Sequence, residues 1–165
     1  MENRRAAANP IRVLVVEDNP ADADLVRIAL DEHEPGKYTI VHVRQLKAAI
    51  EQLSRDRTDV VLLDLGLPDA DGLETLDRIQ ATRPGTPVVV LTGRADRATG
   101  LAAIERGAQA YVLKGWEEPN DLLASIKSAV SRRSALSELA SVTDRMRTAD
   151  ERLRKIGPES RAKKA

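Results

Sequence analysis

The chain has 165 residues, of which 42% are hydrophobic and 32% charged, a balance that excludes an intrinsically disordered or membrane-spanning protein. It contains no cysteine, which excludes disulfides and thiolate metal sites, and its first ten residues lack a signal-peptide core, so we expect a cytoplasmic location. The net charge is zero but uneven: residues 1–130 hold 16 Lys and Arg against 21 Asp and Glu, whereas residues 131–165 hold 10 against 5.

Short runs rich in Val, Ile and Leu alternate along the chain with segments of helical periodicity. The predicted strands cover residues 11–16, 38–43, 59–63, 87–92 and 110–113. A predicted helix follows each strand, starting near residues 21, 46, 72, 98 and 119. Each predicted helix has apolar residues at helical spacing: Ala21, Leu25, Ile28 and Ala29 on one side of the first; Leu46, Ala49, Ile50 and Leu53; Leu73, Leu76 and Ile79, which we expect to face inward; Ala98, Leu101, Ala102 and Ile104; and Leu122, Leu123, Ile126 and Val130.

This order of elements predicts an α/β fold with one parallel sheet, because alternating strands and helices return the chain to the same edge each time. The third and fourth strands are apolar throughout, as in a sheet that helices cover on both faces. Five such units in roughly 120 residues are too few for an eight-fold barrel. We therefore expect an open, doubly wound sheet.

The fifth predicted helix continues beyond the length that a fifth unit needs. Neither Gly nor Pro occurs between Asn120 and Ile156, and Gly157-Pro158 then ends the helix. Apolar residues recur there at alternating spacings of three and four, the pattern of a coiled-coil seam: Leu139, Val142, Met146, Ala149, Leu153 and Ile156. We expect this apolar seam to pair, most simply with a second copy of the chain; the alternative is a solvated linker helix.

These patterns predict four regions along the chain. Residues 1–10 are expected to be disordered, residues 11–133 to form the α/β domain, residues 134–157 to form a coiled-coil extension, and residues 158–165 to be a disordered basic tail. We interpret the excess of Arg after residue 131 as a solvated helix surface. Nucleic acid is not an expected partner, because no base-stacking aromatic residues accompany these charges.

Polar side chains stand where four of the predicted strands end. Glu17 and Asp18 follow the first strand, Asp64 the third, Thr92 closes the fourth, and Lys114 follows the fifth. Since the carboxyl ends of parallel strands lie at one edge, where open α/β sheets bind ligands, we expect these groups to meet. Three carboxylates at one point need a cation, and ligation by oxygen alone favours Mg²⁺. With a lysine and a hydroxyl beside them, they could transfer a phosphoryl group.

These motifs resemble those of the response regulator receiver family. The matching segments are Val-Val-Glu17-Asp18-Asn, Leu-Leu-Asp64-Leu-Gly-Leu-Pro68, Val-Leu-Thr92 and Tyr111-Val-Leu-Lys114, and the resemblance covers roughly residues 11–133. Each is weak alone, but their order and their places at strand ends are specific. The resemblance implies a flavodoxin-like five-stranded sheet of order 2-1-3-4-5, and a protein of two-component phosphorelay signalling.

The resemblance also implies roles for the site residues. Asp64 would accept a phosphoryl group from a phosphohistidine on a histidine kinase or a histidine phosphotransfer protein. Glu17, Asp18 and Asp64, together with the backbone carbonyl of Gly66, would hold Mg²⁺.

The resemblance implies that three further residues would change their contacts when Asp64 is phosphorylated. Lys114 would contact the phosphoryl group, Thr92 would swing to hydrogen-bond it, and Tyr111 would move inward. The surface between the fourth and fifth helices would then change and be read by a downstream protein effector.

The sequence departs from the family pattern at several positions. Gly115 follows the lysine where the family usually has a proline, so no cis peptide bond is predicted there, and Gly93 follows Thr92 where many relatives have Ala. Gly66 and Arg94, each two positions beyond a key residue, lack the acid or amide that some relatives place near the attacking water. We hypothesise that the phosphorylated chain dephosphorylates itself slowly.

The sequence disfavours two alternatives to a phosphorylation switch. A phosphatase of the haloacid dehalogenase type would need a second Asp where this chain has Gly66, so we do not expect an enzyme of that kind. A degenerate receiver that acts unphosphorylated as a dimerisation module is disfavoured, because every required side chain is present. Asp69, Asp71 and Asp96 are interpreted as solvated loop or cap residues.

Overall fold

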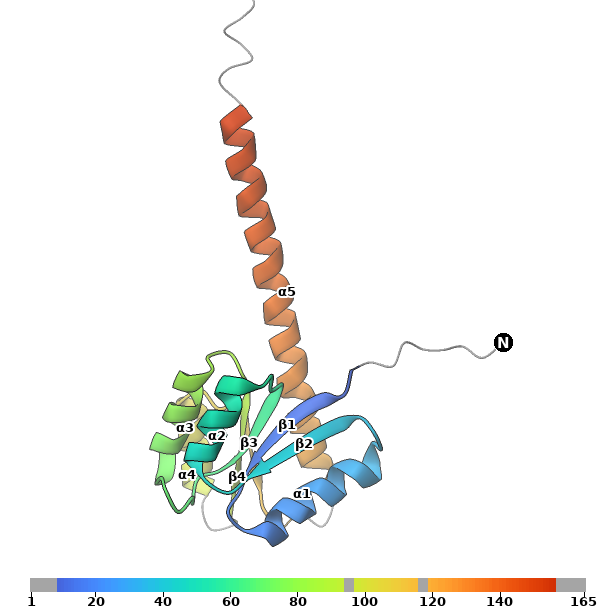
Figure 1. The fold of residues 1–165 in the computed structure, drawn as a ribbon, viewed down its shortest axis with the longest axis vertical. Helices are drawn as coiled ribbons and strands as arrows, with labels where there is room; N and C mark the ends of the chain where they lie inside the picture. Colours follow the sequence, from blue (N-terminus) through green and yellow to red (C-terminus); the bar gives the residue numbers. More distant parts are fainter. Residues whose placement is uncertain (1–8, 94–96, 116–118, 157–165) are drawn as a thin grey trace, which may run out of the picture. The chain divides into compact units, whose positions relative to one another are not determined.

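The computed structural model describes residues 9–93, 97–115 and 119–156. Its strands and helices alternate along the chain (Figure 1), and their bounds are β1 Ile11–Val16, α1 Pro20–His33, β2 Tyr38–Val43, α2 Leu46–Arg55, β3 Val60–Asp64, α3 Gly72–Thr82, β4 Val88–Thr92, α4 Arg97–Glu105, β5 Ala110–Leu113 and α5 Asn120–Ile156. These elements are the ones predicted from the sequence, with ends shifted by a residue or two.

The strands form one parallel sheet in the order β2-β1-β3-β4-β5, as the resemblance implied. In Figure 1, α2, α3 and α4 lie on one face of this sheet, and α1 and the first turns of α5 lie on the other. The expected doubly wound fold is therefore confirmed. The order reverses at β1, because β2 lies on one side of it and β3 on the other, which places the switch point of the sheet between β1 and β3.

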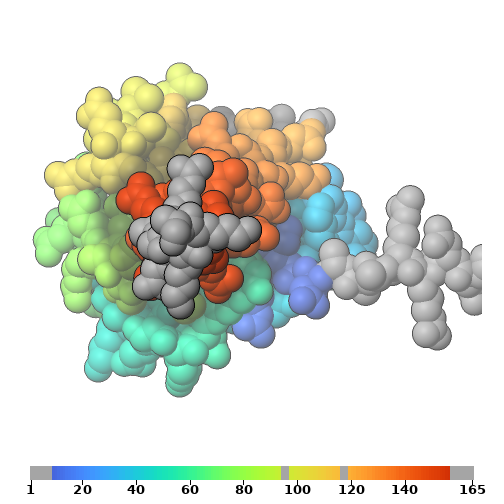
Figure 2. Space-filling view, turned by 90° about the horizontal axis from the view of Figure 1, so that it is seen from above, coloured from blue at the N-terminus to red at the C-terminus, as the bar shows by residue number. Residues whose placement is uncertain are grey.

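Alternate residues of each central strand enter different cores. In β1, Val13 and Val15 pack with α1 and α5, whereas Leu14 and Val16 pack with α2 and α3. This explains why the strands lack the polar positions of a half-exposed sheet. The core that contains Leu14 and Val16 is covered by α2, α3 and α4. In Figure 2 the surfaces of these three helices follow one another from teal through green to yellow.

The side of α1 that carries the apolar residues picked out from the sequence is not the side that packs on the sheet. Leu25 and Ile28 are 50% and 43% exposed, and Ala21 is exposed as well. Of the predicted set only Ala29 is buried, and the helix instead turns four residues toward the sheet: Ala23, Val26, Ala29 and Leu30. Because α1 carries apolar residues around much of its circumference, its periodicity fits two faces, and packing selects the one with Val26 and Leu30.

In α4 the larger apolar residues likewise lie outside the core, because Leu101 and Ile104 are 58% and 39% exposed. The buried residues of this helix are the small ones, Gly100 and Ala103. The ring of Tyr111 on β5 lies so close to Gly100 that a Cβ atom there would stand 2.7 Å from it. An aromatic ring on β5 thus requires a small residue on the facing helix, and the larger side chains are left outside.

The long helix α5 belongs to two compact units, Met1–Val130 and Ser131–Ala165, each of which is described by itself. In the first unit, α5 buries four side chains against the sheet: Leu122, Leu123, Ile126 and Ala129. In the second unit, every described residue except the partly exposed Arg133 is exposed, including the whole apolar seam. Within the described ranges, no helix has the length and apolar character needed to cross a membrane. The predicted disordered ends, apart from residues 9 and 10, lie outside those ranges.

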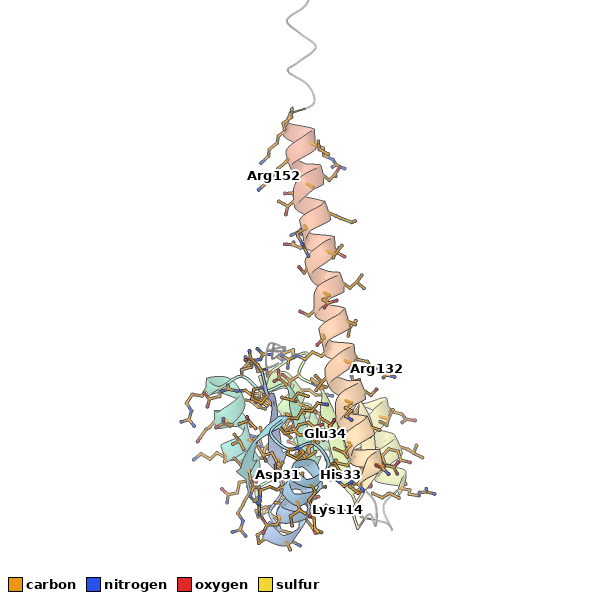
Figure 3. All side chains as sticks on the ribbon, turned by 90° about the vertical axis from the view of Figure 1, so that its right-hand side faces the viewer. Asp31, His33, Glu34, Lys114, Arg132 and Arg152 are labelled. Atoms are coloured by element: carbon orange, nitrogen blue, oxygen red, sulfur yellow. The ribbon has the colours of Figure 1, made fainter. Side chains whose placement is uncertain are left out.

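Glu34, at the end of α1 away from Lys114 (Figure 3), ties three elements together. Its Oε1 lies 2.7 Å from the Lys37 ammonium and 3.0 Å from that of Lys127 on α5, and its Oε2 accepts a hydrogen bond from the Tyr38 hydroxyl at 2.6 Å. The contact with Lys37, and after it the one with Tyr38, lowers the pKa of Glu34 from 4.5 to about 2. The burial of the Tyr38 ring and its bond to Glu34 raise the pKa of the Tyr38 hydroxyl.

Replacing Glu34 by Gln is expected to lower the free energy of unfolding by about 1–2 kcal/mol at neutral pH. Because the pKa of Glu34 is lower in the folded than in the unfolded chain, its stabilisation is complete above about pH 5 and is lost as pH falls toward 2. Urea unfolding across this range should show the wild type and Glu34→Gln converging at low pH. An equal difference at every pH would contradict the proposed ion pairs, and Glu32→Gln, at an exposed neighbour, is the matched control.

Candidate functional site

The carboxyl edge of the sheet gathers the residues that the sequence singled out. Glu17 and Asp18 follow β1, Asp64 is the last residue of β3, Thr92 is the last of β4, and Lys114 follows β5. Since β1, β3, β4 and β5 are adjacent in that order, four distant parts of the chain meet at this edge. The site therefore lies at the switch point, where a ligand of such a fold is expected.

Lys114 is the centre of this site, and Figure 3 shows it near the beginning of α1. Its Nζ lies 2.6 Å from Glu17 Oε2, 3.0 Å from Asp64 Oδ2 and 3.1 Å from Asp22 Oδ2. Its backbone N–H donates to the Thr92 carbonyl at 2.6 Å, which holds the end of β5 against the end of β4. Sequence reasoning missed Asp22; its place in the first turn of the helix that follows Asp18 was the available signal.

Burial and nearby charges determine the protonation of Glu17 and Asp64, the two inner acids of the site. Burial raises the pKa of Glu17 to about 7, against the opposing contacts with Lys114 and with the Asn19 N–H, which donates to Oε1 at 3.1 Å. Burial also acts to raise the pKa of Asp64, but the Gly66 N–H, 3.1 Å from Oδ1, and the Lys114 ammonium outweigh it and lower that pKa. Asp64 is therefore a carboxylate at neutral pH, whereas the raised pKa of Glu17 brings its titration close to that pH.

The ion pair between Lys114 and the inner acids keeps the lysine charged. Burial opposes its charge, but the contacts with Glu17 and Asp64 raise the pKa of Lys114. Glu17 is fully buried, and its Oε2 contacts Lys114 without the alignment of a hydrogen bond, so this oxygen remains able to take another cation.

The three predicted metal ligands fit a divalent cation. Glu17, Asp18 and Asp64 each offer an oxygen, and these atoms all lie within 4.8 Å of one another. All donors are carboxylate oxygens, which Mg²⁺ prefers, and Glu17 supplies the buried oxygen just described. For Gly66, the contact seen is its N–H bond to Asp64, so its carbonyl as a fourth ligand stays a prediction.

Two side chains from the end of β2 position the acidic loop, and sequence reasoning missed both. His42 Nε2 lies 2.7 Å from the Glu17 carbonyl oxygen and must donate to it, and Arg44 Nε donates to the Asp18 carbonyl at 3.1 Å. They fix the loop after β1 through its backbone and leave its carboxylates free for the site.

The loop that follows Asp64 is anchored by another acid. Asp69, expected as a loop or cap residue, accepts the backbone N–H groups of Leu46 and Lys47 at 2.8 and 2.9 Å and so caps α2. These bonds lower the pKa of Asp69, although its partial desolvation opposes them. Asp71 stands at the N-cap of α3 without a side-chain capping bond, and Asp96 lies outside the described residues.

The two predicted switch residues, Thr92 and Tyr111, lie on the neighbouring strands β4 and β5. Thr92 is 4% exposed, and its hydroxyl has no hydrogen-bond partner among the described residues. A buried hydroxyl without a partner costs about 1–3 kcal/mol, so this group is available to a ligand that enters the site. Tyr111 is half-buried and pairs in register with Val90, with its ring against Gly100.

The glycine after Lys114 has a backbone conformation that side chains rarely adopt. Gly115 has φ +78°, in the left-handed region, and the peptide bonds of the described residues are trans. The departure from the family's proline thus comes with a different local backbone. Arg94, the other departure near the site, lies outside the described residues.

Comparison with known proteins decides the family. A model of the response regulator receiver domain matches residues 13–127. The chain belongs to this family. The receiver is 38% identical over 153 residues to the transcriptional regulatory protein TrcR of Mycobacterium tuberculosis, a match that covers 91% of this chain and 53% of that one.

Other matches agree with this assignment. The DNA-binding response regulator MtrA of Mycolicibacterium smegmatis is 32% identical over 134 residues, covering 81% of this chain and 57% of its own. A CheY-like receiver domain protein from Methanospirillum hungatei superposes with a TM-score of 0.66 at 26% identity, covering 76% of this chain and 98% of that one. These proteins serve signalling, as the sequence predicted.

This receiver spans about half the length of the regulators that it matches. Their names concern transcription and DNA binding, so they lend no support to the expectation that nucleic acid is not a partner.

Proposed function

We propose that this receiver accepts a phosphoryl group on Asp64 from a phosphohistidine of a histidine kinase or phosphotransfer protein. The observation that carries the proposal is the Asp64 carboxylate itself, ionised at neutral pH, 3.0 Å from the Lys114 ammonium and beside two further acids. A carboxylate oxygen would attack the phosphorus, the P–N bond would break, and the electron pair and a proton would go to the departing histidine.

The residues around Asp64 would bind Mg²⁺ and contact the phosphoryl group. Glu17, Asp18, Asp64 and the Gly66 carbonyl would hold Mg²⁺, which when bound neutralises phosphoryl charge. Lys114 would move from Asp64 Oδ2 to a phosphoryl oxygen at small cost, since it already lies 3.0 Å from that atom. Its other contacts, with Glu17 and Asp22, keep the ammonium at the site throughout.

The switch would begin at Thr92. Its buried hydroxyl gains a partner when it donates to a phosphoryl oxygen, and Tyr111 follows inward from its place against Gly100. The surface of α4, β5 and the first turns of α5 would then differ between the two states. We propose that a downstream protein reads this surface, in the cytoplasm.

Incubation with acetyl phosphate and Mg²⁺ tests the proposal. The intact mass should rise by one phosphoryl group, the gain should need Mg²⁺, and hydroxylamine should remove it, as it does from an acyl phosphate. A folded protein that binds Mg²⁺ yet gains no mass would overturn the proposal and favour a receiver that works unphosphorylated.

The phosphorylated chain is expected to last for minutes or longer, because no side chain at position 66 can orient an attacking water. A Cβ atom on Gly66 would lie 3.7 Å from Asp64 Oδ1, an ordinary contact, so the variant Gly66→Asn should fold. We expect it to shorten the phosphoryl half-life by about tenfold, which is less than a positioned acid or base contributes, because an amide can orient a water but does not take its proton. The half-life is measured as the loss of the mass gain with time. A wild-type half-life of only seconds would contradict the hypothesis.

We also propose that two copies associate through the apolar seam. All six of its residues are exposed, Met146 and Leu153 by 69% and 68%, and a stripe of this kind on a solvated helix is typical of a coiled-coil surface. Removing it from water would stabilise the pair.

A further inference from the structure

The helical segment 131–156 carries charges beside its apolar seam, and they distinguish the two ways of pairing. In heptad terms Leu139, Met146 and Leu153 are a positions, and Val142, Ala149 and Ile156 are d positions. The g positions before each a residue are Glu138, Arg145 and Arg152, and the e positions after Val142 and Ala149 are Thr143 and Asp150. These flanking positions face a partner helix and set its orientation.

Parallel pairing makes two attractive contacts. In a parallel, in-register pair, a g residue faces the e residue five positions later on the other helix. Arg145 of each copy then faces Asp150 of the other, and Glu138 faces the neutral Thr143. In a single copy Arg145 bonds to Ser141 and Asp150 pairs with Arg154, both on the exposed helix surface, so both groups can turn toward a partner.

Antiparallel pairing makes repulsive contacts instead. To bury all six seam residues it must set a positions against d positions, with Met146 opposite Ala149 and Val142 opposite Leu153. The g positions then face each other, which places Arg145 beside Arg152 of the second copy, twice by symmetry (Arg152 is labelled in Figure 3). Asp150 would face only the neutral Thr143. Like charges oppose this arrangement.

We infer that the apolar seam pairs in parallel and in register with a second copy of this chain, with Arg145 of each copy facing Asp150 of the other. The inference rests on the proposed homodimer and adds its orientation. Identical ends of the two seams then lie together, so the two receivers join the coiled coil at the same end.

Cysteine cross-linking of the full chain tests the orientation, because the chain has no cysteine of its own. In a parallel pair, Val142→Cys should form an intermolecular disulfide, since the two 142 positions face each other. In the antiparallel pair they would be eleven residues apart, roughly 16 Å along the axis and beyond the reach of a disulfide. Ile156→Cys should behave in the same way and replaces the first variant if that one does not fold.

An equimolar mixture of Val142→Cys and Leu153→Cys detects the antiparallel pair, in which these two positions face each other. A disulfide between the two different variants, identified by intact mass, would overturn the parallel orientation and leave the homodimer standing. A wild-type chain that light scattering shows to be monomeric at tens of micromolar would overturn the homodimer itself, and an assembly of more than two copies would overturn the two-stranded pair. Phosphorylation of Asp64 is measured separately by mass, so failure there is a distinct result.

Charge reversal tests the two residues named. Asp150→Arg should raise the dimer dissociation constant by about tenfold, because two attractive pairs become repulsive. Adding Arg145→Asp to Asp150→Arg should restore tight pairing, since the charges are then exchanged. Glu151→Arg changes the same charge at the adjacent f position, which points away from the seam, and should have little effect. Equal weakening by Glu151→Arg, or no recovery in the double variant, would overturn the assigned contact.

Discussion

Replacement of Asp64 by asparagine should abolish phosphorylation by acetyl phosphate and by any phosphohistidine donor. The amide is nearly the same size but is a poor nucleophile, and it removes one of the three carboxylates that lie within 4.8 Å of one another. The fold should persist, because the amide oxygen can still accept the Gly66 N–H, and Lys114 keeps its contacts with Glu17 and Asp22. Intact mass after incubation should therefore show no gain in a protein that unfolds cooperatively.

Asp71→Asn is the matched control for this experiment. Asp71 lies in the same loop and makes no side-chain capping bond, so its amide variant should take up phosphate like the wild type. Phosphorylation of Asp64→Asn to the wild-type extent would show that another residue is the acceptor. Loss of phosphorylation in Asp71→Asn as well would point to damage to the loop rather than to the loss of a nucleophile.

Replacement of Lys114 by methionine should cost about 3 kcal/mol of the free energy of unfolding at neutral pH without metal. Lys114 is the cation that contacts Glu17, Asp22 and Asp64, and its side chain is 21% exposed, so little water replaces it. Methionine keeps the apolar stem but leaves the three carboxylates to repel one another. Urea unfolding of both proteins in a chelating buffer would measure the loss.

The loss of unfolding free energy in Lys114→Met should depend on pH and on Mg²⁺. Without Lys114 the folded chain holds its acids at pKa values above those of the unfolded chain, so stability falls as pH rises above about 4.5. The deficit should then be small near pH 5 and full above about pH 7, and Mg²⁺ should reduce it by replacing the missing charge. Lys127→Met, at a 48% exposed lysine paired with Glu34, should cost less than about 1 kcal/mol. An equal deficit at both pH values would contradict the electrostatic explanation.

The sequence by itself determined the fold and most of the site. The alternation of strands and helices is written in the hydrophobic pattern, and a parallel sheet has one carboxyl edge, so Glu17, Asp18, Asp64, Thr92 and Lys114 had to meet there. The continuous helix to Ile156 followed from the absence of Gly and Pro. Each of these inferences needs only local rules and the order of the elements.

Only the tertiary structure decided which side chains share an environment. Leu25, Ile28, Leu101 and Ile104 fit an amphipathic pattern but are exposed, because neighbouring elements select smaller or differently placed residues for the core. Asp22 contacts Lys114, and His42 and Arg44 contact the backbone of Glu17 and Asp18. These contacts form because the folded chain brings together segments that are far apart in the sequence. The raised pKa of Glu17 likewise depends on burial, as does the Thr92 hydroxyl, which has no hydrogen-bond partner among the described residues. Burial and pairing are properties of packing in three dimensions, and periodicity along a chain does not encode them residue by residue.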